Sequence, residues 1–358
     1  MAEGEKSEGS RPPTIEMVAA KAGVGRQTVS YAINQPQRVA APTLARVRAA
    51  IEELGYRPNR VARSLRTQST RTIGYRVQPT PHGLPSPVLD RFVHALAGTA
   101  RQAGYNILLC AAEDDTEELE VYGELIQSAA VDAFVLSDPV YADPRPAWLA
   151  DRGVPSVSFG RIWGLEHASA WVDVDGAAGT RAAVDHLVEN GHRDIAFLGL
   201  PADRATVDDR FRGWRSAMHH HGLSTSGLTT RGAARSLEEA QRLAAKLLGK
   251  RRPTAVVASH DLLAIACYHE AERLGLTVGT DLAVVGFDDS PPASMARPGL
   301  SSVSQPLESV GAEIVRLVVG ILAGELPRDH EVVLAPELVI RGSSGPVQVQ
   351  SRNSSSSS

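Results

Sequence analysis

Apolar residues recur at helical spacing three times within the first sixty positions. A helix over 15–22, capped by Thr14 and ended by Gly23, would carry on one face Ile15, Val18, Ala19 and Ala22. A second helix over 26–34 follows Val24-Gly25 directly. A third begins at Pro42-Thr43 and closes at Gly55. Two short helices joined by a glycine-containing turn and followed by a third predict a small helix-turn-helix unit.

From Thr72 onward the pattern changes to short β-rich runs that alternate with amphipathic helical stretches. The first series of expected strands covers residues 73–77, 106–111, 132–137 and 155–159. The second covers 170–174, 195–199, 254–259 and 283–287, with helices around 179–190, 210–221, 237–248 and 262–274. This alternation predicts an α/β domain of two similar lobes with parallel sheets. Ligands of such sheets bind outside the carboxyl ends of the strands, so we expect a site in the cleft between the lobes.

The segments between these patterns predict the domain boundaries. We expect a disordered tail over 1–13, a helix-turn-helix unit over 14–57, a hinge helix and linker over 58–71, a two-lobed domain over 72–342, and a disordered, serine-rich tail over 343–358. The run Arg60–Leu65 is compatible with a helix but too short to be stable alone in water. Such a segment can fold when two copies pair over DNA.

Charge is distributed unevenly along the chain. Residues 11–71 contain eleven Lys or Arg and three acids, a net charge of +8, whereas residues 72–358 have a net charge of −10. A short basic module is what neutralisation of phosphates requires. No apolar stretch approaches the ~20 residues that span a bilayer, and the amino terminus is polar. We therefore expect a cytoplasmic protein without a membrane partner.

The sequence offers no catalytic or metal-binding set. Cys110 and Cys267 each lie within an apolar run, which favours buried, reduced thiols. Consecutive residues on a helix face different directions, so the run His219–His221 cannot supply three ligands to one ion. There is no phosphate-binding loop and no Gly-x-Ser-x-Gly motif. We expect neither an enzyme nor a cofactor.

Residues 14–34, which read TIEMVAAKAGVGRQTVSYAIN, resemble the headpiece of the LacI/GalR family of transcriptional repressors. The similarity continues through Arg38-Val39 and Glu53–Tyr56 into 57–65, which looks like that family's hinge. It returns at 189–195, 210–214, 252–256, 260–261, 285–289 and 300–306. The resemblance implies an all-α helix-turn-helix headpiece followed by a two-lobed α/β domain of the periplasmic-binding-protein type. The implied function is a sequence-specific repressor whose affinity for its operator is switched by a small ligand, a sugar, bound between the lobes.

The second helix of a helix-turn-helix enters the major groove, so Arg26 and Gln27 are the expected base readers. Arginine suits guanine O6 and N7, and glutamine suits adenine. The resemblance implies further contacts to phosphates, or positions flanking the reader helix, for Thr14, Ser30, Asn34, Arg38 and Tyr56. In the hinge it implies that Leu65 wedges between base pairs, with Ala62 allowing close approach and with Arg60 and Arg63 near phosphates.

The alternative for the hinge is a basic linker with an incidental leucine. Paired hinges and half-site reading require two copies, so we expect a homodimer on pseudo-palindromic double-stranded DNA.

For the ligand site, Arg210 opens a helix and Asp288 follows a strand, so a guanidinium and a carboxylate can converge on the hydroxyls of a mono- or disaccharide. The resemblance maps both onto effector contacts and adds Phe159, Arg204, Thr206, Trp214 and His260 as candidates. The alternatives are that Phe159 and Trp214 belong to the core or the cleft wall, and that Arg204 lies on the surface.

Two departures from the family leave the identity of the ligand open. Residues 82–92 read HGLPSPVLDRF where many members have an Asn-Pro-Phe-Phe-like sequence. Within this run, Asp90 either contacts the ligand or stabilises the first turn of a helix. His260 stands where asparagine is common in the family.

A second hypothesis is a sugar-binding or sugar-processing protein whose amino-terminal helices are incidental, because similar two-lobed bodies serve other functions. Under the first hypothesis the sequence is compatible with both induction and corepression, and we predict induction by a sugar.

Overall fold

The computed structural model describes residues 13–57, 69–77, 87–164, 169–201, 205–234, 236–250 and 252–347. The chain divides into two compact units, residues 1–70 and 71–358, which are described separately below. Several predicted contacts lie outside the described residues, namely Arg60, Ala62, Arg63 and Leu65 of the hinge and Arg204. The side chain of Thr206 is likewise outside the described part. Among the described residues, no helix combines the length and the apolar character that crossing a bilayer requires.

The amino-terminal unit is a three-helix bundle, as the apolar spacing predicts. Its helices are α1 (Ile15–Ala22), α2 (Arg26–Asn34) and α3 (Ala41–Leu54), with a 3₁₀ turn at Pro36–Arg38. The Thr14 hydroxyl accepts a hydrogen bond from the backbone N–H of Met17, which caps α1. Gly23 ends α1 in the left-handed conformation, with φ of 64°. Each helix contributes a fully buried valine to one small core: Val18, Val29 and Val47.

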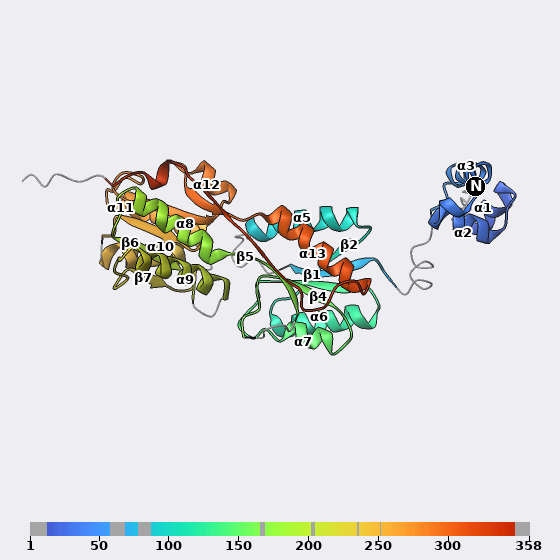
Figure 1. Cartoon of the computed structure of the whole chain (residues 1–358), viewed down its shortest axis with the longest axis horizontal. Coiled ribbons are helices and arrows are strands. Elements are labelled where there is room, and N and C mark those ends of the chain that lie inside the picture. Colours follow the sequence, from blue (N-terminus) through green and yellow to red (C-terminus); the bar gives the residue numbers. More distant parts are fainter. Residues whose placement is uncertain are drawn as a thin grey trace, which may run out of the picture. The chain divides into compact units, whose positions relative to one another are not determined.

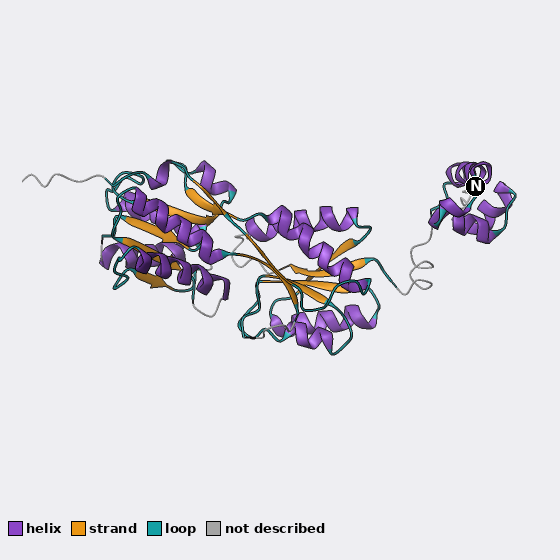
Figure 2. Cartoon of the chain, in the orientation of Figure 1, coloured by secondary structure: helices purple, strands orange, loops and turns teal. Residues whose placement is uncertain are grey.

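The larger unit contains two six-stranded sheets, one in each lobe (Figures 1 and 2). The first sheet has the order β11-β5-β4-β3-β1-β2 and is parallel throughout. Its strands are β1 (Thr72–Val77), β2 (Asn106–Ala111), β3 (Ala133–Ser137), β4 (Ser156–Phe159), β5 (Ala170–Val174) and β11 (Glu331–Leu334). Its helices are α5 (Pro87–Gln102), α6 (Asp115–Gln127), α7 (Arg145–Ala150) and α13 (Leu307–Leu322). Two separate apolar clusters, one built with α5 and α13 and one with α6 and α7, bury the two faces of this sheet.

The second sheet has the order β12-β10-β9-β8-β6-β7, and within it only the β10–β12 pair is antiparallel. Its strands are β6 (Ile195–Gly199), β7 (Thr229–Arg231), β8 (Ala255–Ala258), β9 (Ala283–Asp288), β10 (Ser301–Ser304) and β12 (Glu337–Val339). Its helices are α8 (Gly176–Glu189), α9 (Ala205–His220), α10 (Leu237–Lys250), α11 (Asp261–Arg273) and α12 (Pro291–Met295).

The chain passes between the lobes three times. The passages connect β5 to α8, β10 to α13, and β11 to β12, and the last of these is the long red ribbon in Figure 1. The expected division of the strands is therefore wrong at 170–174, which we placed in the second series. This segment is β5 of the first sheet, because Ala170, Val172 and Val174 pack in the core of the first lobe. Apolar alternation shows that a segment is a strand, but it does not show which sheet receives it.

The expected disorder from Ser343 onward is also wrong for its first residues. A 3₁₀ turn spans Gly342–Ser344, and the side chains of Ser343 and Ser344 are buried. The Ser343 hydroxyl accepts a hydrogen bond from the Ser301 N–H at 2.8 Å and donates one to the Val284 carbonyl. These small hydroxyls find backbone partners inside the second lobe, so polar composition does not imply disorder here.

A buried network of four charges lies in the first lobe. The Glu118 carboxylate accepts from Arg76 at 2.6 Å and from Arg145 at 3.1 Å, and Arg145 also pairs with Asp143 at 2.6 Å. The Tyr122 hydroxyl donates to Glu118 as well. Burial and the neighbouring carboxylate raise the pKa of Tyr122. The two positive and two negative groups are mutually paired, which is the condition for burying them.

Candidate DNA-reading face and effector site

The amino-terminal end of α2 presents both predicted base readers to solvent. Val29 and Ala32 face the core, and Arg26 and Gln27 lie on the exposed side of the helix. The Gln27 amide donates a hydrogen bond to the Tyr31 hydroxyl at 3.2 Å. Arg26 Nη1 lies 3.2 Å from the Glu16 carboxylate. Each reader is thus held by a neighbouring side chain.

The flanking residues divide into two kinds. Thr14 caps α1, and the Asn34 amide donates to the Ser30 carbonyl at 2.9 Å, so both have local roles within the unit. Arg38 lies 5.8 Å from the centre of the Tyr31 ring. Sequence reasoning missed Tyr31, although its position four residues after Gln27 on the same helical face is a usable signal.

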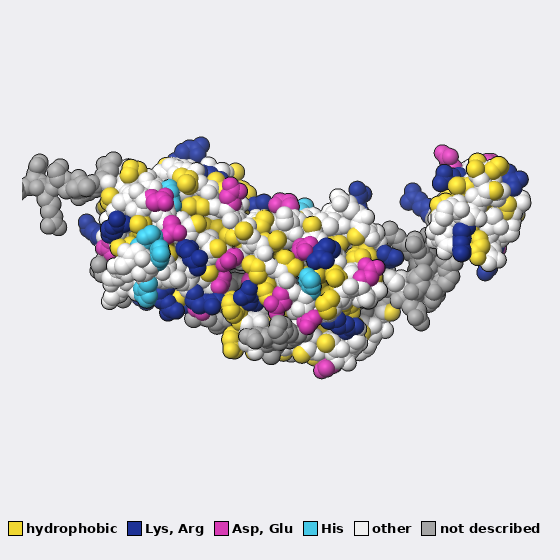
Figure 3. Space-filling model, viewed as in Figure 1, with side chains coloured by type: hydrophobic (Ala, Val, Ile, Leu, Met, Phe, Trp, Pro, Cys, Tyr) yellow, Lys and Arg dark blue, Asp and Glu magenta, His cyan; other side chains and the backbone are white. Residues whose placement is uncertain are grey.

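Tyr56 packs against the core of the bundle, and partial burial, with Glu16 nearby, raises its pKa. On the face visible in Figure 3, Lys and Arg outnumber acids over this amino-terminal unit, whereas acids and bases are mixed over the larger unit.

The candidate effector site centres on Arg210 of α9 and Asp288 at the end of β9. Their nearest charged atoms are 3.6 Å apart, and both residues are buried. Arg210 Nη1 donates to the Ser259 carbonyl, and the guanidinium lies 3.7 Å from the centre of the Phe287 ring. The structure therefore brings the two residues together, as expected from the sequence.

Burial dominates the electrostatics of this pair. It raises the pKa of Asp288 to about 7, although the Arg210 guanidinium opposes this shift. Burial also lowers the pKa of Arg210. Asp288 has a positive φ of 107° and Asp289 one of 47°. Non-glycine residues in such conformations are kept where the surrounding structure enforces them, and they concentrate at binding sites.

Gln305 is a member of this site that the sequence reasoning missed. Its amide nitrogen donates to the Asp288 carboxylate at 2.8 Å, and the side chain is buried. Gln305 follows β10, which is paired with β9 in the sheet. A buried amide directly after a strand that neighbours the Asp288 strand was the available signal. Gln305 lies on the passage from β10 to α13. The Asp288 carboxylate is therefore hydrogen-bonded to a segment that joins the lobes.

His260 joins the same edge of the second sheet. It follows β8, adjacent to β9, and its Nδ1 lies 2.9 Å from the Ser259 hydroxyl. The carboxyl ends of three neighbouring strands thus present His260, Asp288 and Gln305, while α9 adds Arg210.

The other described candidates lie apart from this group. Phe159 ends β4 in the first lobe, and its ring centre is 4.7 Å from that of Phe92 in the core. Trp214 has no exposed surface and packs with Phe211 and Phe197 in the core of the second lobe. Asp90 lies in the first turn of α5, and 70% of its side chain is exposed. We therefore leave Trp214 out of the proposed site and favour the helix-stabilising role for Asp90.

A stack of aromatic and basic groups joins the lobes beside these residues. The guanidinium carbon of Arg212, on α9, lies 4.2 Å from the centre of the Trp163 ring, in the loop after β4. Arg161 lies 4.7 Å from the ring centres of both Trp163 and Trp171. The side-chain Nε of Arg161, Nε1 of Trp163 and Nε of Arg212 are buried without a hydrogen-bond partner. Buried N–H groups without a hydrogen-bond partner are uncommon, because leaving them unsatisfied costs free energy. This cluster therefore carries such a penalty.

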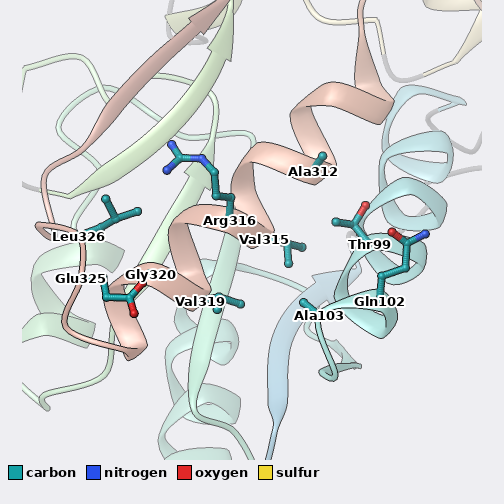
Figure 4. A pocket seen from close by; sticks show the side chains of 10 residues that line it. All are labelled: Thr99, Gln102, Ala103, Ala312, Val315, Arg316, Val319, Gly320, Glu325 and Leu326. Atoms are coloured by element: carbon teal, nitrogen blue, oxygen red, sulfur yellow. The ribbon is translucent and has the colours of Figure 1, made fainter.

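A separate groove lies between α5 and α13 in the first lobe (Figure 4). Its volume is about 570 Å³, and its lining includes Thr99, Val315, Arg316 and Val319. None of the predicted effector contacts lines it, so it is not the candidate site.

Comparison with protein families and curated proteins places these features among regulators. Residues 14–59 match the family model for bacterial regulatory proteins, lacI family, and residues 184–344 match the periplasmic binding protein-like domain. The chain is 35% identical to the HTH-type transcriptional regulator CelR of Thermobifida fusca over 336 residues, which cover 93% of this chain and 98% of CelR. It is 30% identical to the HTH-type transcriptional repressor PurR of Pectobacterium carotovorum subsp. carotovorum (strain PC1), covering 92% and 96% of the two chains.

Solved structures give the same picture. A complex of the transcriptional regulator CelR with cellobiose matches with a TM-score of 0.72 and 34% identity, over 92% of this chain and 99% of that one. The lac repressor dimer bound to operator and the anti-inducer ONPF matches with a TM-score of 0.79 and 26% identity, over 94% and 100%. The similarity thus extends over both units of the chain.

Proposed function

The chain belongs to the lacI family of bacterial regulatory proteins, and from this premise we propose that it is a homodimeric repressor released from a pseudo-palindromic operator by a mono- or disaccharide. It acts in the cytoplasm, where its DNA target lies. Arg26 and Gln27 read bases, and the pair of lobes binds the effector.

One observation carries the ligand class: the buried Arg210–Asp288 pair at the carboxyl ends of the second sheet. The guanidinium supplies hydrogen-bond donors, and the ionised carboxylate supplies acceptors. Neighbouring sugar hydroxyls can donate to one group and accept from the other. The Gln305 amide adds a fixed donor that orients the carboxylate.

Cellobiose is our first candidate for the effector, because a similar regulator, CelR, was solved in complex with this disaccharide. His260 contributes a ring nitrogen at the same edge of the sheet, and its hydrogen bonds select among sugars. We propose induction: the sugar has the higher affinity for the conformation with low affinity for DNA, and it shifts the population by that difference in affinity.

Dimerisation is supported by the need to read two half-sites and by the dimeric state in the similar lac repressor structure. Exposed apolar residues of the larger unit offer contact surface. Leu109 on the edge strand β2 is 52% exposed, and Met295 on α12 is 71% exposed. The alternative of a sugar-processing enzyme is not favoured, since the similar curated proteins are transcriptional regulators.

Operator selection with the purified full chain tests this function. We expect enrichment of an imperfect palindrome from a random duplex library at fixed salt, because affinity driven by phosphate contacts depends steeply on salt. Size-exclusion chromatography with light scattering should show a dimer on the selected DNA. Failure to enrich any sequence, or a monomer in complex with operator, would refute the proposal.

A further inference from the structure

We propose that Glu16 is a specificity-determining residue, whose carboxylate holds Arg26 in the orientation that reads guanine. The inference rests on the proposed function, in which Arg26 contacts bases. It assigns to an acid of α1 a role in base recognition by α2.

The geometry places the two side chains together at one corner of the bundle. Glu16 is the second residue of α1 and Arg26 the first residue of α2, and Arg26 Nη1 lies 3.2 Å from Glu16 Oε1. Both side chains are exposed, Arg26 to 72% and Glu16 to 59%. Hydrogen bonds from its own backbone, from Thr14 and from Arg26 lower the pKa of Glu16. The carboxylate is therefore charged at neutral pH.

A carboxylate at this position needs an explanation. Residues 11–71 contain only three acids, Glu16, Glu52 and Glu53. Glu53 pairs with Lys21, between α3 and the end of α1. Glu16 instead contacts a predicted base reader, where a negative charge weakens attraction to phosphates. Glu16 therefore lowers the overall affinity for DNA. Such a residue has a use if it improves discrimination between DNA sequences.

Arg26 has enough N–H donors to contact Glu16 and guanine at the same time. The guanidinium has five N–H donors, and bidentate recognition of guanine O6 and N7 uses two of them. Glu16 occupies a donor on Nη1 and leaves the others available. An exposed ion pair contributes little in water, but its strength increases when DNA excludes solvent from the contact. An arginine that is already oriented also loses less side-chain freedom on binding.

The pair also acts against wrong sequences. A free arginine can turn to a phosphate when the base opposite is not guanine, which preserves affinity without specificity. Pairing with Glu16 restrains Arg26 from turning to a phosphate in this way. Gln27 is restrained by Tyr31 in a comparable way, so each reader has its own positioning side chain.

The test compares Glu16→Gln with Glu53→Gln, which removes the same charge from the same unit without touching a reader. Both variants and the wild type are titrated with the selected operator, with operators in which each guanine is replaced in turn, and with a random duplex. Arg26→Ala identifies the guanine that Arg26 reads. Thermal melting by circular dichroism checks that each headpiece remains folded.

We expect Glu16→Gln to lower discrimination at that guanine about tenfold, within the range for one bidentate contact. Both glutamine variants should bind random duplex several-fold more tightly, and Glu53→Gln should keep full discrimination. Equal discrimination in the two variants would overturn the inference, as would an Arg26→Ala variant with unchanged base preference. These outcomes leave the repressor function intact, whereas a wild type that selects no operator would refute the proposed function itself.

Discussion

Arg212 lies over the ring of Trp163 at 4.2 Å, so a helix of the second lobe stacks on a loop of the first. Arg210, two residues earlier on the same helix, pairs with Asp288 in the candidate effector site. Movement of one lobe against the other would therefore disturb a contact on α9, the helix that carries Arg210 of the candidate effector site. Under the proposed function, this relationship would couple ligand binding to the arrangement of the lobes.

Replacing Arg212 by Ala should alter effector binding, because it removes the stack that joins the lobes. A matched control is Arg152→Ala, which removes a cation–π contact with Trp148 at 3.7 Å within the first lobe. Each change should lower stability by about 0.5–2 kcal/mol. Calorimetric titration with the sugar should show altered affinity for Arg212→Ala only. Equal sugar affinities in the two variants would contradict a role for the stack in binding.

Ligand affinity should depend on pH through Asp288. Burial raises its pKa to about 7, above the usual 3.8, and the groups that face it are Arg210, Gln305 and the more distant Asp261. Sugar hydroxyls donate to the ionised carboxylate, so affinity should rise as pH increases from 6 to 8. Titration calorimetry across this range measures the effect. Asp288→Asn should bind weakly with a flatter profile, whereas the exposed control Asp329→Asn should match the wild type. An unchanged profile in Asp288→Asn would remove Asp288 from the site.

The raised pKa of Asp288 has the opposite effect on folding stability, which should fall as pH rises. A carboxyl whose pKa is raised in the folded state favours folding most below its unfolded pKa, and this contribution is lost as pH rises through 7. The wild type should therefore lose stability relative to Asp288→Asn between pH 4 and pH 8, as measured by urea unfolding of both proteins. The absolute stability of the variant also reflects the Arg210 that it leaves unpaired, so the pH dependence of the difference is the relevant quantity. A constant difference across this range would contradict the raised pKa.

Glu118→Gln should destabilise the first lobe strongly. The substitution leaves Arg76 and Arg145 buried with one fewer negative partner, and breaking such a network costs about 3–5 kcal/mol. The control is Glu313→Gln, which breaks the more exposed pair with Arg316 and should cost about 1 kcal/mol or less. Chemical denaturation distinguishes them, and similar losses for both variants would contradict the structural role of the network.

Gly213→Ala should be destabilising, and Gly98→Ala should not. A methyl group at Gly213 would come within 2.2 Å of the Ala177 carbonyl oxygen, where α9 crosses α8. At Gly98, within α5, nothing lies within 4 Å of the added carbon. We expect a loss of about 1–3 kcal/mol for the first and a gain of about 0.5–1 kcal/mol for the second. Differential scanning calorimetry measures both, and a neutral Gly213→Ala would show that the helices can separate without cost.

Sequence reasoning succeeded where local rules decide the structure. The three helices of the amino-terminal unit follow from apolar spacing, the Thr14 cap and Gly23, all of which act within a few residues. Arg210 and Asp288 were expected together because the patterns placed one at the start of a helix and the other directly after a strand, although in the structure α9 begins at Ala205, five residues before Arg210.

The missed features depend on contacts distant in sequence. Strand 170–174 joins the first sheet because of packing that its own pattern does not contain. Gln305 acts through Asp288, seventeen residues away, and its position after a strand does not by itself indicate that hydrogen bond. Ser343 looks like part of a polar tail until its partners at Ser301 and Val284 are known. Long-range pairing, which leaves no local periodicity, accounts for each of these differences.

In the proposed function, a sugar bound between the lobes switches affinity for the operator. The most direct measurement is fluorescence anisotropy of the selected operator with the full chain at fixed salt, titrated with cellobiose and then with a panel of mono- and disaccharides. We predict that one sugar releases the wild type from DNA. Arg210→Lys keeps the positive charge but loses the planar guanidinium with its paired N–H donors, so this variant should bind the same operator and require at least tenfold more sugar for release. The control, Arg215→Lys on the exposed side of α9, should respond like the wild type. Operator binding that no sugar in the panel alters, or an equal response from Arg210→Lys, would contradict the account.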